Sequence, residues 1–131
     1  MIDTPTPAQV LAPVVLRFLA RVAVADGIVD PAEVDMLLHV AGTMGLGEAD
    51  ARRVLDDELV QKSDAGTLAR QLPDPAHARS VFGLGCMMAF AEGHIAPAER
   101  EVLDGYARGA GLTPEQAQEI LDEVLASMAQ S

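Results

Sequence analysis

The sequence predicts an all-α protein of about seven helices, built by internal duplication of one helix-turn-helix unit. Three observations predict this fold class. The 131-residue chain is 50% hydrophobic but only 3% aromatic, and it shows little alternation of β-branched residues. Prolines recur where helices are expected to begin. Residues 22–59 align without a gap with residues 88–125, at an offset of 66, with 14 identities in 38 positions.

The helix boundaries follow from capping residues, prolines and glycines. Five expected helices open with proline, and four of these prolines follow a side chain that can accept a hydrogen bond, as in Thr6-Pro7, Asp30-Pro31, Asp74-Pro75 and Thr113-Pro114; the fifth is Ala96-Pro97. With Gly27, Gly45, Gly93 and Gly111 as stops, we expect helices over residues 7–25, 31–44, 48–61, 64–72, 75–91, 97–110 and 114–129. Pro13 is expected to kink or restart the first of them.

The two copies also share their apolar stripes, which indicates that both use the same helix faces. We therefore expect a single domain over residues 1–131, with two helical hairpins packed on the long helices 7–25 and 75–91. The matched stripes are Met36, Leu37, Val40, Ala41 and Met44 against Val102, Leu103, Tyr106, Ala107 and Ala110, and Ala51, Val54, Leu55 and Leu59 against Ala117, Ile120, Leu121, Val124, Leu125 and Met128.

Charge and cysteine content limit the function classes. The net charge of −11 and a pI near 4.4 repel nucleic acid and anionic lipid and favour cations or basic protein surfaces. We expect no signal peptide and no membrane-spanning helix, because the amino terminus lacks a basic region and the apolar runs are short. The lone Cys86 lies in an apolar run, where a buried thiol and a cytoplasmic location are expected.

Each copy carries two acids on either side of a glycine turn, Asp26 and Glu33 in the first and Glu92 and Glu99 in the second. Asp26 and Glu92 are expected in the last turn of a helix, where the helix dipole disfavours a carboxylate. A bound cation would relieve that penalty. An EF-hand is excluded because the register puts apolar Val22 at the first ligand position.

Two interpretations of these acids remain open. In one, Asp26, Asp30, Glu33, Glu92 and Glu99 bind a divalent metal ion, with calcium, magnesium or manganese preferred to zinc. In the other, the acids only cap the following helices. The first gains support from the second copy, where Ala96 cannot complete a capping box although both glutamates are present. His94 is expected to be an exposed loop residue.

The doubled segment Ala25-Asp26-Gly27-Ile28-Val29-Asp30-Pro31-Ala32-Glu33 and Ala91-Glu92-Gly93-His94-Ile95-Ala96-Pro97-Ala98-Glu99 resembles the TerB-like family. That family includes the tellurite-resistance protein TerB and the amino-terminal domain of a membrane-anchored DnaJ-type co-chaperone. The resemblance implies a seven-helix fold, a cytoplasmic role in bacterial stress response, and divalent metal binding by Asp26, Glu33, Glu92 and Glu99, with Asp30 as an accessory. This sequence departs from the family pattern at Glu92 and Ala96.

The main alternative is a non-catalytic interaction or dimerisation module. Val34 and Leu38 widen the apolar face of helix 31–44, and that face needs cover from the same chain or from a partner protein. No enzyme is expected, because neither Cys86 nor His39 nor His77 has an activating neighbour in the sequence.

Two local patterns complete the sequence-based expectations. Asp56-Asp57-Glu58 is interpreted as a solvated helix face paired with Arg52 and Arg53. Gly83-Leu84-Gly85 is interpreted as a close contact between helices.

Overall fold

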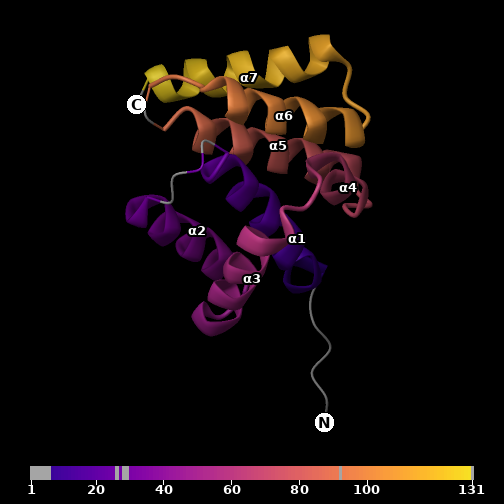
Figure 1. The fold of residues 1–131 in the computed structure, drawn as a ribbon. Coiled ribbons are helices and arrows are strands. Elements are labelled where there is room, and N and C mark those ends of the chain that lie inside the picture. Colours follow the sequence, from indigo (N-terminus) through magenta and orange to yellow (C-terminus); the bar gives the residue numbers. More distant parts are fainter. Residues whose placement is uncertain (1–6, 26, 28–29, 92, 131) are drawn as a thin grey trace.

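The computed structural model describes residues 7–25, 27, 30–91 and 93–130, and this part of the chain contains helices and no strand. The predicted fold class is confirmed, and the helix bounds differ from the expected ones by two residues at most. The helices are α1 (Pro7–Ala23), α2 (Pro31–Thr43), α3 (Glu48–Gln61), α4 (Ala65–Arg70), α5 (Pro75–Ala89), α6 (Pro97–Gly109) and α7 (Pro114–Ala129), shown in Figure 1.

The predicted caps form at the helix starts that the structure describes. Asp30 Oδ1 accepts the N–H of Ala32 at 2.8 Å, and Asp74 caps α5 in the same way. Thr113 and Gln116 form a complete capping box at the start of α7. These side chains satisfy backbone N–H groups that have no partner within the helix.

Pro13 lies inside α1, which continues as one helix from Pro7 to Ala23. The expectation that the helix restarts there is therefore wrong. A proline removes one backbone hydrogen bond, but α1 is packed against α2, α3, α4, α5 and α6, and burial of its side chains maintains the helix.

The internal duplication is visible in the backbone. α2 and α6 begin and end at positions related by the offset of 66, as do the ends of α1 and α5 and the starts of α3 and α7. Gly27 and Gly93 both adopt positive φ, at 83° and 94°. The turns after α2 and α6 close through equivalent bonds, Leu46 N–H to Ala41 O at 3.0 Å and Leu112 N–H to Ala107 O at 2.9 Å.

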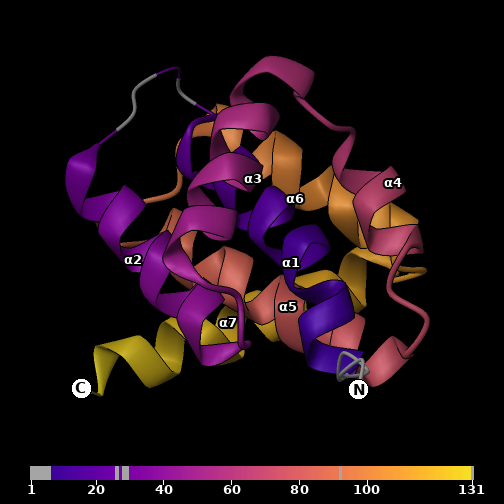
Figure 2. The same cartoon turned by 90° about the horizontal axis from the view of Figure 1, so that it is seen from below.

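The two long helices form the centre of the fold. Figure 2 shows α1 in the middle, with α2, α3, α4 and α5 around it. A Cβ atom on Gly85 would lie 2.6 Å from the ring of Phe18, so glycine permits the close approach of α1 and α5 that the sequence predicts. Tyr106 from α6 is fully buried against this contact, with its ring centroid 4.0 Å from that of Phe18.

The helix α4, between the copies, makes the two halves unequal. It packs closely on α6, where Gly66 meets the backbone at Gly109. α2, the counterpart of α6, packs mainly against α1 and α3. In consequence Met36, expected in the apolar stripe, is 45% exposed.

The wider apolar face of α2 is covered within the chain, at least in part. Val34 and Leu38 are half-buried and pack against the core. The sequence leaves open whether this apolar face packs against the same chain or against a partner protein. For Val34 and Leu38, packing within the same chain accounts for the burial.

Candidate functional site: the acidic turns and the cleft between the copies

In the second acidic turn, the structure gives Glu99 a capping role. Its Oε1 accepts the N–H of Ala96 at 2.9 Å, across the first turn of α6. Ala96 has no side-chain acceptor, so this is half of a capping box. Glu99 therefore has a structural role even though Ala96 offers no side-chain acceptor. The presence of Glu99 in this turn no longer favours a metal ion over a cap.

In the first acidic turn, Asp30 is the N-cap of α2, and Glu33 lies half-buried in the first turn of that helix. Asp26 and Glu92 lie outside the described residues, so the structure does not show whether either one converges with Glu33 or Glu99. Among the residues that are described, no three His, Cys, Asp or Glu side chains gather closely enough to hold a metal ion. The preceding helices α1 and α5 end at Ala23 and Ala89, two residues earlier than expected.

The sequence-based expectations for Cys86 and His94 agree with their positions. Cys86 is fully buried, and burial raises the pKa of its thiol to about 12. His94 is exposed in the turn before α6.

The interpretation of Asp56-Asp57-Glu58 as a solvated face is wrong for Glu58, which is 1% exposed. Its carboxylate accepts the N–H and the hydroxyl of Ser63, at 2.5 and 2.6 Å, and a hydrogen bond from Arg17 at 3.2 Å. Arg17 also pairs with Asp57 at 2.7 Å. This buried group, which we call the Glu58 network, joins α1 to the connection between α3 and α4.

The predicted partners of Arg52 and Arg53 are also wrong. Arg52 pairs with Glu48 one turn earlier, at 3.4 Å, and Arg53 with Asp50, at 3.3 Å. The acid at position 58 points to α1 because it lies on the same helix face as the buried Ala51, seven positions before it.

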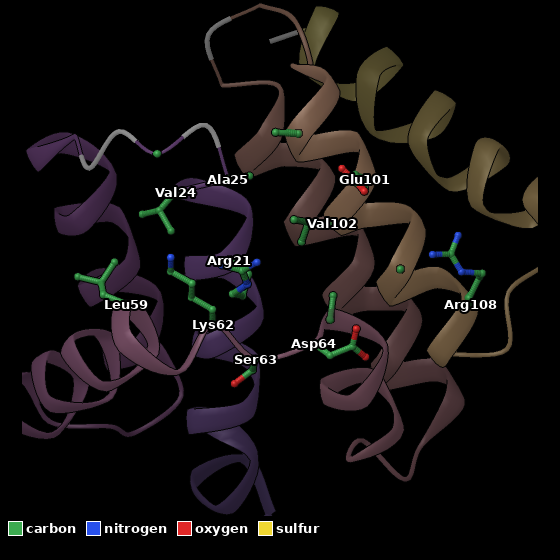
Figure 3. Close-up of a pocket in the computed structure, with 14 residues that line it drawn as sticks. Arg21, Val24, Ala25, Leu59, Lys62, Ser63, Asp64, Glu101, Val102 and Arg108 are labelled. Atoms are coloured by element: carbon green, nitrogen blue, oxygen red, sulfur yellow. The ribbon is translucent and has the colours of Figure 1, made fainter.

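A cleft of about 800 Å³ lies between the two copies. One wall comes from the end of α1, the end of α3 and the connection after it, and the other from the start of α4 and from α6 (Figure 3). The charged residues that line it are Arg21, Lys62, Asp64, Glu101 and Arg108. Leu59, expected in the apolar stripe of α3, is instead 40% exposed and lines this cleft.

Lys62 occupies an unusual backbone conformation at the mouth of the cleft. It ends α3 in the left-handed region, with φ 49° and ψ 58°, and among the described residues it alone combines a positive φ with a side chain. That conformation costs about 1 kcal/mol for a residue other than glycine. The next residue, Ser63, is held by the Glu58 network, so the position of Lys62 is fixed from both sides.

Arg21 lies in the last turn of α1 on the same wall of the cleft. Its Nε is buried and has no hydrogen-bond partner among the described residues. A buried donor left without a partner costs about 1–3 kcal/mol, so such groups in native structures call for an explanation.

No local motif in the sequence marks Arg21, Lys62 or the Glu58 network as functional. A signal for them exists in the repeat. At the same offset of 66, Arg21 aligns with Met87 and Lys62 with Met128, whereas Arg17 and Glu58 align with Gly83 and Val124. Charged groups thus stand in the first copy where the second copy has apolar residues or glycine.

The comparisons with known proteins give one match. The model of a family described as a protein of unknown function (DUF533) matches residues 3–124. No curated protein and no solved structure matches the chain. None of the described helices has the length and apolar character needed to cross a membrane.

Proposed function

The chain belongs to the DUF533 family, and from that premise we propose that it is a TerB-like, cytoplasmic stress-response protein of the tellurite-resistance type. It acts by binding and not by catalysis. Its ligand is a divalent cation, held by the first acidic turn through Asp26 and Glu33, with Asp30 as an accessory. The second turn, with Glu92 and Glu99, is the weaker site.

The observation that supports this proposal is the repetition of one turn design. In both copies a helix is followed by a glycine at positive φ, an extended N-cap residue and a proline that opens the next helix. The sequence puts one acid just before the glycine and one in the first helical turn after it, in both cases. A shared local backbone with acids at the same two places is a basis for a shared ligand.

The described contacts favour the first turn. Glu99 uses one oxygen to cap Ala96, and Glu33 also has a partner, so these two glutamates do not distinguish the turns. Asp30 uses Oδ1 for capping and has a second oxygen, and position 96 offers no carboxylate at all. A hard cation prefers several oxygen ligands, so the first turn is the better site.

The test is calorimetry and thermal unfolding with calcium, magnesium and manganese after treatment with a chelator. We expect a Kd on the order of 0.1–1 mM, because the turn supplies few protein oxygens. At about 10 mM ion such a site stabilises the fold by about 1.4–2.7 kcal/mol, a rise of several degrees in Tm.

The variant that tests the site is Asp26→Asn with Glu33→Gln. A matched control, Asp56→Asn with Glu123→Gln, removes the same charge from positions outside the acidic turns. The first variant should lose the ion-dependent rise in Tm, and the control should keep it. If no ion gives heat and the first variant is simply less stable, the acids are caps.

In that event the alternative is a non-catalytic interaction module. The observation that favours it is a pair of adjacent apolar residues at the end of α3, where Leu59 is 40% and Val60 82% exposed. Sedimentation of the wild type and of Val60→Lys would separate self-association from a monomer, because a charge at an interface position weakens association.

A further inference from the structure

The basic residues of this acidic protein are unevenly distributed. Five of the nine, Arg17, Arg52, Arg53, Arg70 and Arg100, form ion pairs with acids. The other four, Arg21, Lys62, Arg79 and Arg108, have no acidic partner within 4.0 Å in the described part of the chain. Three of these four line the cleft between the copies.

Two acids, Asp64 and Glu101, also line the cleft, both on the wall formed by the start of α4 and by α6. Asp64 is engaged by hydrogen bonds from the backbone and side chain of Thr67 and lies 4.0 Å from Arg70. Arg21 lies in the last turn of α1, where the helix dipole favours a cation but supplies only about half an elementary charge. Among the described residues that line it, the wall that carries Arg21 and Lys62 has these two basic side chains and no acid, in a chain with a net charge of −11.

The buried Nε of Arg21 points to the same conclusion independently. The guanidinium has donors in a fixed planar fork, which matches the oxygens of a phosphate or carboxylate. The Nε donor is buried and lacks a partner among the described residues, and the Arg21 side chain also lines the cleft. An oxyanion bound at this wall would pair with the guanidinium of Arg21.

We propose that the cleft between the copies binds a small organic molecule through its phosphate group, which contacts Arg21 and Lys62. The volume of about 800 Å³ falls within the range of small-molecule sites and is much larger than a phosphate ion requires. Val24, Leu59 and Val102 provide apolar surface for the body of the ligand, and Arg108 lies on the opposite wall. This site is separate from the proposed cation site and does not depend on it.

The test follows the Nε–H resonance of Arg21 in a nitrogen–proton correlation spectrum during titration with inorganic phosphate. Sodium chloride at equal ionic strength serves as the reference, and the titration is run both with and without a chelator. We expect a saturable shift with a Kd on the order of 1 mM. Phenyl phosphate, which adds an apolar body to the same anion, should bind at least about fivefold more tightly.

The variant Lys62→Gly removes the charge at a position where glycine adopts the observed φ without strain, so the fold is retained. It should weaken binding about tenfold, because one charge-assisted contact is lost. The control is Arg79→Gln, which removes the unpaired arginine that lies outside this cleft and should change affinity less than about twofold.

Four results would overturn the inference. One is the absence of a saturable shift with either phosphate; another is equal loss of affinity in Lys62→Gly and Arg79→Gln. The third is binding that appears only when the chelator is omitted, since the anion would then be bound by the metal. Equal affinity for phenyl phosphate and inorganic phosphate would reject the organic ligand. None of these results bears on metal binding in the absence of phosphate, so the two proposals fail separately.

Discussion

Replacement of Glu58 by glutamine should destabilise the protein by about 2–4 kcal/mol. The carboxylate accepts three hydrogen bonds, two from Ser63 and one from Arg17, and it is 1% exposed. Hydrogen bonds to a charged group contribute about 1.5–3 kcal/mol each, and removal of one member of a buried ion pair costs about 3–5 kcal/mol. Glutamine keeps one acceptor oxygen but turns an NH₂ group toward donors.

The estimate stays below the upper limit because Arg17 is not left without an acid. It keeps its contact with Asp57, at 2.7 Å, and its side chain is 24% exposed. Burial alone lowers the pKa of Arg17, but the hydrogen bonds and charges of Asp57 and Glu58 together raise it. In the variant the guanidinium still pairs with Asp57 and stays charged, as arginine does in proteins. The expected loss is still a large part of the 5–15 kcal/mol typical of a folded domain.

The measurement is urea unfolding at neutral pH, read as a change in midpoint at constant m value. Asp56→Asn is the matched control, an exposed acid in the same helix that should change the free energy of unfolding by less than about 0.5 kcal/mol. If Glu58→Gln behaves like this control, the Glu58 network does not stabilise the fold and the reasoning is refuted.

The double variant Arg17→Met with Glu58→Met extends this test to the repeat. The equivalent residues of the second copy, Gly83 and Val124, form an apolar contact in which a Cβ on the glycine would lie 3.8 Å from the valine. Apolar replacement of a buried ion pair is often neutral or stabilising. We expect the double variant to be more stable than Glu58→Met alone by at least about 1 kcal/mol, in a double-mutant cycle.

Three further predictions follow from local packing. Gly109→Ala should lower the free energy of unfolding by about 1–3 kcal/mol, because the new Cβ would overlap the backbone of α4. Gly42→Ala should raise it by up to about 1 kcal/mol, because its Cβ would enter open space; urea unfolding measures both. Cys86 should react with a thiol reagent at neutral pH only at the rate of unfolding, because the thiol is buried. Its pKa is about 12 in the folded protein and about 8.5 in the unfolded chain, so the stability present below pH 8.5 is lost as the pH rises toward 12. Cys86→Ala should therefore weaken this alkaline loss of stability. Tyr106→Phe should cost about 1 kcal/mol through loss of the buried 2.8 Å hydrogen bond to the carbonyl of Ala78, and no loss of Tm would contradict this.

The helix boundaries were predictable from the sequence because they depend on short-range interactions. A cap such as Asp74 needs only the N–H two residues later, and Gly45 and Gly111 adopt positive φ for reasons within their own backbone. The duplication was predictable for a similar reason, since an ungapped alignment carries the same caps and turns into both copies. The local expectation of a helix restart at Pro13 failed because burial of α1 outweighed the lost hydrogen bond.

The acidic turns show the limit of sequence analysis at the candidate site. The same pattern of an acid three residues into a helix fits a cap or a metal ligand, and for Glu99 it is the hydrogen bond from the N–H of Ala96 that assigns a capping role. Asp26 and Glu92 lie outside the described residues, so for these two the metal site stays a prediction.

The sequence by itself determined the all-α class and the helix order, because each depends on residues a few positions apart, and it determined the duplication, because the two copies align without a gap. The tertiary structure alone decided which charges are buried. Glu58 follows two exposed aspartates in an acidic run, yet its side chain faces Arg17, 41 positions earlier. Likewise Arg21 and Lys62 meet at one cleft only because α1 and α3 pack together. Burial and partner choice depend on contacts between distant segments, which a pattern of period 3.6 does not specify.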